Sequence, residues 1–285
     1  MVTAFFWGTM PVAGKVVLLG ASPFFVTFVR FLTAGLLLAV ALVLFRRREE
    51  LHLLRKPPWL LLAATLGLVG NYVLYIVGLQ YTTATAAQFI IQTGTVFLVA
   101  WSALFLKERL TARRVAGMAL AITGVLIVSW NGQSLDVLVG SDIFVGNLII
   151  VASALCWSLY AVLQKGLGRR YTSYATLIVV YFAGALITSP GALILPTEAT
   201  WVVWVALAYL CLNTLLAYGA FAESLQHVDA STTSVIVTFA PLVTVVLVAL
   251  LAPLAPHLYA GEITRYTLAG GALILAGILT VIRER

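Results

Sequence analysis

Long apolar blocks alternate with short polar segments along the whole chain, and the blocks carry almost no charge. Runs without Asp, Glu, Lys or Arg extend over residues 57–106, 115–135, 143–164, 171–197, 199–222 and 230–261. Each run is close to or longer than the ~20 apolar residues that a helix needs to cross a bilayer. Turn residues, prolines and charges divide the chain into ten predicted spans, at about 2–20, 23–45, 57–78, 83–105, 111–130, 142–164, 171–194, 200–222, 230–251 and 264–282.

The second half of the chain repeats the first. Trp7 stands eight residues before Lys15, and 150 positions later Trp157 stands eight residues before Lys165. Further equivalent pairs are Tyr72 and Tyr218, Tyr75 and Phe221, Leu79 and Leu225, Gln80 and Gln226, Gly117 and Gly270, and Gly124 and Gly277. Five spans fall in each copy, 1–135 and 136–285, and an odd number makes the second copy enter the membrane from the opposite side. The predicted fold is therefore an all-α membrane protein of ten transmembrane helices in two inverted five-helix repeats.

Composition agrees with a lipid environment. Hydrophobic residues make up 62% of the chain, charged residues only 9%, and the mean hydropathy is +1.07. That leaves too little polar surface for a soluble globule of this size, and continuous apolar blocks exclude a transmembrane β-barrel. The net charge of +7 does not indicate nucleic acid as a partner, because the charges lie in short loops and form no stripe.

The Lys and Arg residues predict the orientation in the membrane. Ten spans place 14 of the 17 on one side, namely Arg46, Arg47, Arg48, Arg55, Lys56, Lys107, Arg109, Arg113, Arg114, Lys165, Arg169, Arg170, Arg283 and Arg285. Lys15 and Arg265 fall on the other side, and Arg30 lies inside the second span. By the positive-inside rule, the N- and C-termini are both cytoplasmic.

Polar residues form a stripe on the fourth span. Thr85, Gln88, Gln92 and Thr95 are spaced three, four and three residues apart, which places them on one helix face. The equivalent positions of the ninth span are Ser231, Ser234, Thr238 and Pro241. One interpretation is a solute cavity lined by Gln88, Gln92, Ser234 and Thr238, and the other is hydrogen bonding that holds the helices together.

Aromatic residues recur beside these stripes. Those that lie within spans, or pair between the copies, are Trp7, Tyr72, Tyr75, Trp157, Tyr160 and Tyr218. Rings that carry a hydroxyl or an indole N–H suit a pocket for an organic solute, and ordinary core packing is the alternative. Aromatic residues near span ends, Tyr259 among them, are expected in the interfacial belt.

Charged residues within the spans are almost absent. The ten acids map to loops or span ends, which argues against a proton relay built on a buried carboxylate and against an intramembrane protease. No catalytic residue, cofactor or metal is predicted, so the protein is not expected to be an enzyme. Arg30 pairs with a carboxylate-bearing solute, or it reaches the surface or hydrogen-bonds to backbone carbonyls. Small residues of the fifth and tenth spans predict that these two helices pack against each other.

The chain resembles the EamA-repeat family of the drug/metabolite transporter superfamily, and its aromatic, carboxylate-poor interior resembles the YddG-type amino acid exporters. The likeness rests on the two five-span copies, Trp7 and Gly8 followed by Lys15, and the Leu-Lys-Glu-Arg-Leu segment at 106–110 that leads into Gly117 and Gly124. The family's proline of the fourth span is replaced by Thr95, whereas Pro241 keeps it in the ninth.

This resemblance implies an inner-membrane transporter that exports small organic metabolites, above all neutral and aromatic amino acids, by alternating access. Its partners are then the solute and membrane lipid, and the chain acts as a monomer. A sugar, nucleotide-sugar or drug carrier of the same superfamily is the first alternative. A structural or receptor-like bundle without transport is the second.

Overall fold

The protein is described by a computed structural model that covers residues 2–54, 57–106, 111–134, 137–138, 140–168, 170–196, 200–227 and 237–282. These residues form α-helices and short 3-10 helices and include no strand. Apart from the helices that form the spans, the described elements are η1 (Arg48–Leu54), η3 (Ser189–Leu193) and the short α13 (Pro256–Tyr259).

A helix lies in each of the ten predicted spans. In chain order these helices are α1 (Val2–Val17), α2 (Pro23–Leu44), α3 (Trp59–Tyr81), α4 (Ala84–Ile90) with α5 (Gly94–Leu106), α6 (Ala112–Trp130), α8 (Asp142–Leu167), α9 (Ser173–Thr188), α10 (Trp201–His227), α12 (Ala240–Leu251) and α14 (Arg265–Ile282). Eight spans are long and apolar enough to cross a membrane, and α1 and α12 are shorter apolar helices. The predicted all-α membrane fold is confirmed.

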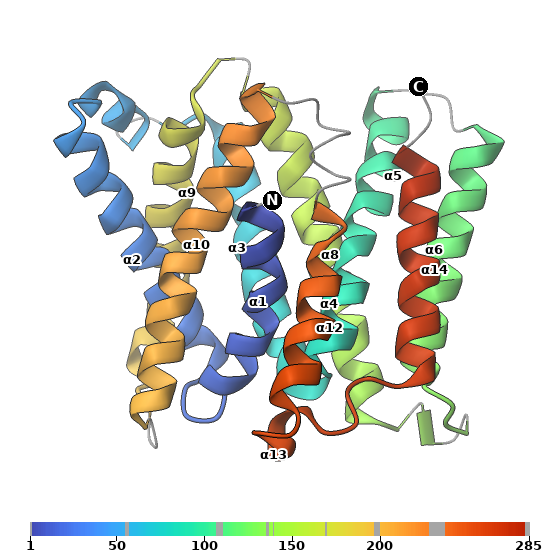
Figure 1. Ribbon diagram of the computed structural model, residues 1–285. Coiled ribbons are helices and arrows are strands. Elements are labelled where there is room, and N and C mark those ends of the chain that lie inside the picture. The colour runs from blue at the N-terminus through green and yellow to red at the C-terminus, as the bar shows by residue number, and fades with distance from the viewer. Residues whose placement is uncertain are drawn as a thin grey trace.

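The two repeats are inverted with respect to each other. In Figure 1, α1 runs toward the lower end of the molecule, whereas its counterpart α8 runs toward the upper end. Helix contacts obey the same symmetry, because α3 packs on α8 as their counterparts α10 and α1 pack on each other. Two other contacts, α2 with α9 and α6 with α14, join a helix to its own counterpart.

Serine and threonine side chains cap the N-termini of five of these helices. The side-chain oxygens of Ser22, Thr83, Thr111, Ser141 and Thr172 each accept a hydrogen bond from the backbone N–H three residues further on. Such a cap satisfies one of the N–H groups that the first turn of a helix leaves unpaired.

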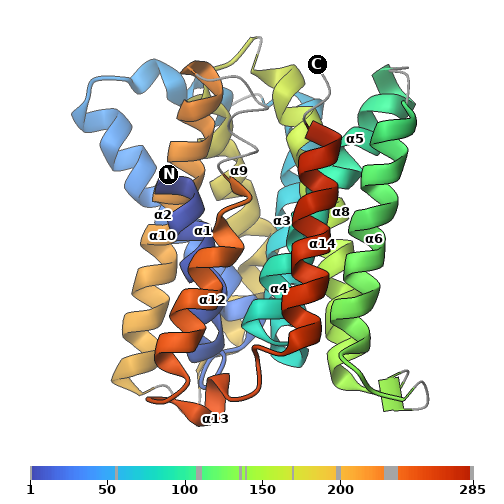
Figure 2. The same cartoon turned by 45° about the vertical axis from the view of Figure 1, so that its right-hand side comes forward.

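The α6 and α14 helices pack backbone against backbone at one edge of the bundle (Figures 1 and 2). A Cβ atom at Gly124 would lie 2.5 Å from the carbonyl oxygen of Gly270, and one at Gly277 would lie 2.5 Å from that of Gly117. Only glycine allows this approach. The predicted contact between the fifth and tenth spans is confirmed.

The fourth span is broken in its middle. After α4 ends at Ile90, a 3-10 turn, η2, covers Ile91–Thr93, and α5 begins at Gly94. The Thr93 hydroxyl donates a hydrogen bond to the Ile90 carbonyl at 2.7 Å, which satisfies an acceptor near the break. The span therefore loses regular α-helical geometry without a proline.

Candidate functional site

Six aromatic side chains meet where the two repeats face each other. This aromatic cluster consists of Trp7, Tyr72, Trp157, Tyr160, Tyr218 and Phe221, from α1, α3, α8 and α10. The rings of Trp7 and its repeat counterpart Trp157 have centroids 6.2 Å apart and cross at 87°. Tyr72 and its counterpart Tyr218 have centroids 5.7 Å apart. Equivalent side chains of the two repeats are thus in direct contact.

The cluster has a buried part and a more accessible part. Tyr72, Tyr160 and Tyr218 are buried, whereas Trp7, Trp157 and Phe221 are only partly buried. Phe221 lies 5.1 Å from Trp7 and 6.3 Å from Trp157, measured between ring centroids. Sequence reasoning did not select Phe221 as a site residue, although its equivalence to Tyr75 was a signal for it. The accessible rings provide apolar faces of the kind that organic solutes contact.

Tyr75 and the two glutamines make their hydrogen bonds outside the aromatic cluster. The Tyr75 hydroxyl donates to the Gln88 side-chain oxygen at 3.4 Å. Gln92 donates from its Nε2 to the Val237 carbonyl at 3.2 Å, which joins the fourth span to the ninth. Both glutamines are buried. These bonds match the helix-joining interpretation, and a cavity lined by the same residues stays a prediction.

Two further predicted site residues belong to the ninth span. Thr238 is buried, with 7% of its surface exposed. Ser234 lies outside the described residues. The structure therefore brings together five of the predicted site residues, Trp7, Tyr72, Trp157, Tyr160 and Tyr218, and it places Tyr75 beside Gln88.

Arg30 is buried next to the aromatic cluster. Its side chain is only 3% exposed, so it does not reach the surface, which was one of the sequence-based alternatives. Its Nε–H donates to the hydroxyl of Thr214 at 2.9 Å, and its guanidinium carbon lies 4.6 Å from the ring centroid of Tyr72. No carboxylate of the described residues lies within ion-pair distance of it. The partners of this buried cation in the described ranges, Thr214 and Tyr72, are therefore neutral.

Glu262 is a buried carboxylate that caps α4. It is 3% exposed and accepts hydrogen bonds from the backbone N–H groups of Ala84 and Thr85, at 3.0 and 3.2 Å, and from the Thr85 hydroxyl at 3.1 Å. Burial raises the pKa of the Glu262 carboxyl, while these donors and the charge of Lys15 act in the opposite direction. The expectation that acids lie in loops holds for Glu262, but the inference that none is buried is wrong.

The segment that carries Glu262 is held against α1 as well. Tyr259 is 2% exposed and donates from its hydroxyl to the Val12 carbonyl at 3.0 Å. Its assignment to the interfacial belt is therefore wrong, because α13 folds under the bundle (Figure 1). The sequence held a signal for Glu262, which precedes Gly270 by eight residues, much as Glu108 precedes the equivalent Gly117 by nine.

Replacing Glu262 by alanine is expected to destabilise the protein by about 1–3 kcal/mol, because three donors at the start of α4 lose a charged acceptor. Glu262→Gln keeps an acceptor oxygen and is expected to cost less. Thermal unfolding of purified protein in detergent measures both changes. Glu49→Ala, which removes an exposed acid, is the control. An unchanged midpoint for Glu262→Ala would show that the cap contributes nothing.

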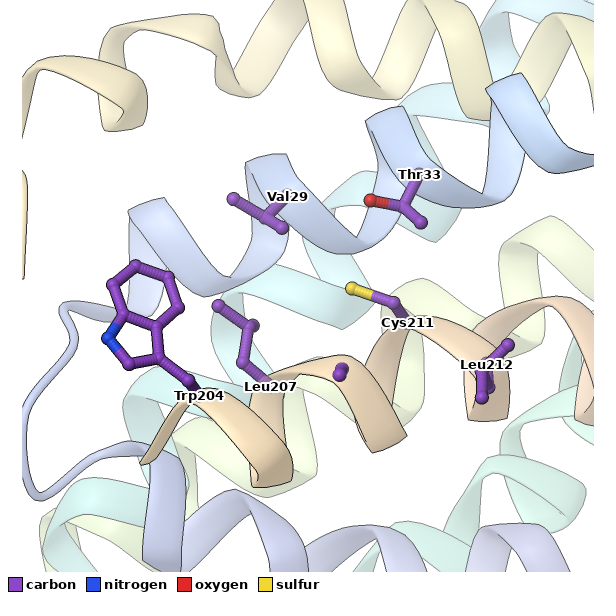
Figure 3. Close-up of a pocket in the computed structure, with 7 residues that line it drawn as sticks. Val29, Thr33, Trp204, Leu207, Cys211 and Leu212 are labelled. Atoms are coloured by element: carbon purple, nitrogen blue, oxygen red, sulfur yellow. The ribbon is translucent and has the colours of Figure 1, made fainter. Parts of the chain in front are cut away.

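A lateral pocket of about 430 Å³ lies between α2 and α10, away from the aromatic cluster. Its lining residues are Val29, Thr33, Trp204, Leu207, Ala208, Cys211 and Leu212. Figure 3 shows the Thr33 hydroxyl and the Cys211 thiol as polar atoms among apolar side chains. None of the predicted site residues lines this pocket.

The described residues include no candidate metal-binding site. No group of three His, Cys, Asp or Glu side chains converges among them. Cys156 and Cys211 are both free thiols.

Two inverted five-helix repeats, with aromatic side chains from both repeats at their interface, form the architecture of a membrane transporter. The family model of the EamA-like transporter family matches residues 1–130 and again 144–283. The chain belongs to this family.

Relatives of the chain are also named as transporters. The "Uncharacterized inner membrane transporter YhbE" of Escherichia coli is 32% identical, over 97% of this chain and 89% of that protein. An "Uncharacterized transporter" of Haemophilus influenzae is 28% identical, over 98% of this chain and 92% of that protein. A solved crystal structure shares the fold with a TM-score of 0.69, at 19% identity over 98% of this chain and 94% of that one.

Proposed function

We propose that the protein exports small organic metabolites, with neutral and aromatic amino acids as the preferred substrates, by alternating access at the aromatic cluster. The observation that carries the proposal is the contact between Trp7 of one repeat and Trp157 of the other, with Phe221 beside both. An aromatic or aliphatic side chain of the solute stacks on such rings.

Alternating access follows from where the cluster lies. A solute held between side chains of both repeats changes its exposure when one repeat rocks against the other, and binding shifts the balance between the two states. Gln88 and Gln92 of the fourth span, with Ser234 and Thr238 of the ninth, extend this proposed site on the polar side.

We place the protein in the inner membrane with both termini in the cytoplasm. The name of the Escherichia coli relative supports a location in the inner membrane, and the uneven distribution of Lys and Arg supports the orientation of the termini. In this orientation the lower end in Figure 1, where Glu262 caps α4 and Tyr259 bonds to α1, is the outer end. The structure then represents a state whose outer end is held by these contacts.

Transport by purified protein in liposomes tests the proposal. We expect saturable uptake of labelled phenylalanine, tryptophan and leucine above protein-free liposomes. Parallel assays with and without a pH gradient separate proton coupling from facilitated diffusion. Uptake of a labelled nucleotide sugar but of no amino acid would favour the sugar carriers of the superfamily. No flux of any screened solute would favour a bundle that does not transport.

A further inference from the structure

Arg30 has more hydrogen-bonding capacity than its surroundings use. A guanidinium group carries five N–H donors, and only the Nε–H has an acceptor among the described residues, the Thr214 hydroxyl. The hydroxyl of Tyr72, whose ring lies beneath the guanidinium, is buried near Arg30, Thr214 and Tyr218, and among the described residues none of these groups meets it in regular hydrogen-bond geometry. The remaining guanidinium N–H groups and the Tyr72 hydroxyl therefore lie side by side with unused hydrogen-bonding capacity.

This arrangement is unfavourable for the protein alone. A cation taken out of water requires a counter-charge and filled hydrogen bonds, and one neutral hydroxyl with one aromatic ring compensates only part of the loss. Thr214, which accepts from Arg30, has a neutral neighbour as well, because the Tyr181 hydroxyl donates to the Thr214 backbone carbonyl at 3.3 Å. Within the described part of the chain, Arg30 thus lacks the counter-charge that a purely structural buried arginine has.

We propose that Arg30, with the Tyr72 hydroxyl, binds the carboxylate of the transported solute. This inference rests on the proposed function and adds the chemical class of the substrate: a monocarboxylate with an apolar or aromatic body. A carboxylate has two oxygens that accept parallel N–H bonds from one guanidinium, and it leaves lone pairs for a hydroxyl donor.

The spacing of the cluster fits such a solute. Tyr72 lies under Arg30, its ring is 5.7 Å from that of Tyr218, and the Tyr218 ring is 5.5 Å from that of Trp7. The carboxylate end therefore faces Arg30 while the apolar end extends over Tyr218 toward the two tryptophans. Arg30 is covered in this conformation, so the carboxylate reaches it when the repeats move apart.

The charge balance favours a carboxylate over a phosphate. Arg30 is the one charged side chain of α2 in its described residues, and α10 contributes the neutral Thr214 and Tyr218 to its surroundings. One cation neutralises the single negative charge of a carboxylate, whereas a phosphate monoester at neutral pH brings close to two. A dianion would leave an uncompensated charge in this apolar site.

Ligand binding by the purified protein in detergent tests the proposal without transport. The probes are L-phenylalanine and 3-phenylpropionate, with L-phenylalaninamide and 3-phenylpropanamide as matched compounds that lack the carboxylate, and phenyl phosphate as the dianion. We expect both carboxylates to raise the thermal midpoint with rising concentration, and we expect no change with the amides or the phosphate. Equal stabilisation by the amides, or stronger stabilisation by phenyl phosphate, overturns the proposal.

Variants then assign the effect to Arg30. Arg30→Gln is expected to weaken the binding of both carboxylates by roughly ten- to a hundredfold, because hydrogen bonds to a charged group are lost. Arg30→Lys keeps the charge but not the planar guanidinium group, and its affinity for carboxylates is expected to lie between those of the wild type and of Arg30→Gln. Arg47→Gln is the control, since Arg47 also lies over a tyrosine ring, 5.3 Å from Tyr174, but is exposed. The Arg47→Gln variant is expected to bind both carboxylates as tightly as the wild type does.

The ligand-free midpoint distinguishes a binding role from a structural one. Replacing a buried cation that has no counter-charge removes its desolvation penalty, so ligand-free Arg30→Gln is expected to unfold at the wild-type temperature or above it. A lower midpoint together with unchanged carboxylate binding would assign Arg30 to structure alone. Should liposomes transport no amino acid while carboxylate binding still requires Arg30, the proposed function fails and the anion site stands.

Discussion

Replacing Trp157 by alanine is expected to lower the flux of aromatic amino acids in liposomes by more than about tenfold, which corresponds to roughly 1.4 kcal/mol or more of lost binding free energy. Trp157 contacts its counterpart Trp7 of α1 and also Phe221 of α10, so its removal takes away the ring that both of these side chains touch on α8. Trp157→Phe keeps an apolar ring and is expected to retain part of the flux. Initial uptake rates of labelled phenylalanine measure both effects.

The control for this result is Trp201→Ala. Trp201 has the same side chain but is 75% exposed at the start of α10, so its loss leaves the site intact. Expression and thermal stability need to be measured in parallel, because Trp157 also packs against Gly94 at the break of the fourth span. Wild-type flux in a folded Trp157→Ala protein would refute the assignment of the aromatic cluster as the substrate site.

Replacing Gly124 by valine is expected to separate α6 from α14 and to destabilise the protein by about 3 kcal/mol or more. The new Cβ would stand 2.5 Å from the Gly270 carbonyl oxygen and 2.7 Å from a side-chain carbon of Ile274. A carbonyl of a neighbouring helix cannot move aside as a flexible side chain can. Gly124→Ala already adds this Cβ and is expected to cost about 1–3 kcal/mol.

Gly219→Ala provides the matched comparison. Gly219 lies inside α10, and a Cβ there meets no described atom within 4 Å. Its replacement is expected to leave stability unchanged or to raise it by about 0.5–1 kcal/mol, because alanine favours the helix. Thermal unfolding in detergent measures both glycines under one condition. Equal effects at the two positions would contradict the close packing of α6 on α14.

The sequence predicted those parts of the fold that depend on local pattern and on duplication. The second span was expected at 23–45 and is Pro23–Leu44, and the tenth was expected at 264–282 and is Arg265–Ile282. Apolar length and span-end residues determine such boundaries. The pairing of Trp7 with Trp157 was not predicted as a contact, although their equivalence was visible, because sequence position does not reveal which residues lie next to the symmetry axis.

Long-range partners explain most of what the sequence did not reveal. The buried Glu262 carboxylate accepts hydrogen bonds from the N–H groups of Ala84 and Thr85, which lie 178 and 177 positions away, and no local pattern reveals such distant donors. Arg30 likewise depends on Thr214, which lies 184 positions away. The break at Ile91–Thr93 was not predicted, because the turn itself contains neither proline nor glycine that would mark it in the sequence.

The self-pairing of equivalent residues has an energetic consequence for the proposed cycle. When the two repeats exchange their conformations, the contact between Trp7 and Trp157 maps onto itself, and so does that between Tyr72 and Tyr218. To first order, their energies therefore cancel from the difference between the inward-open and outward-open forms. Contacts such as that of Glu262 with α4 map to the opposite end of the molecule instead. The resting preference of the carrier is then set by its periphery, and its affinity by its centre.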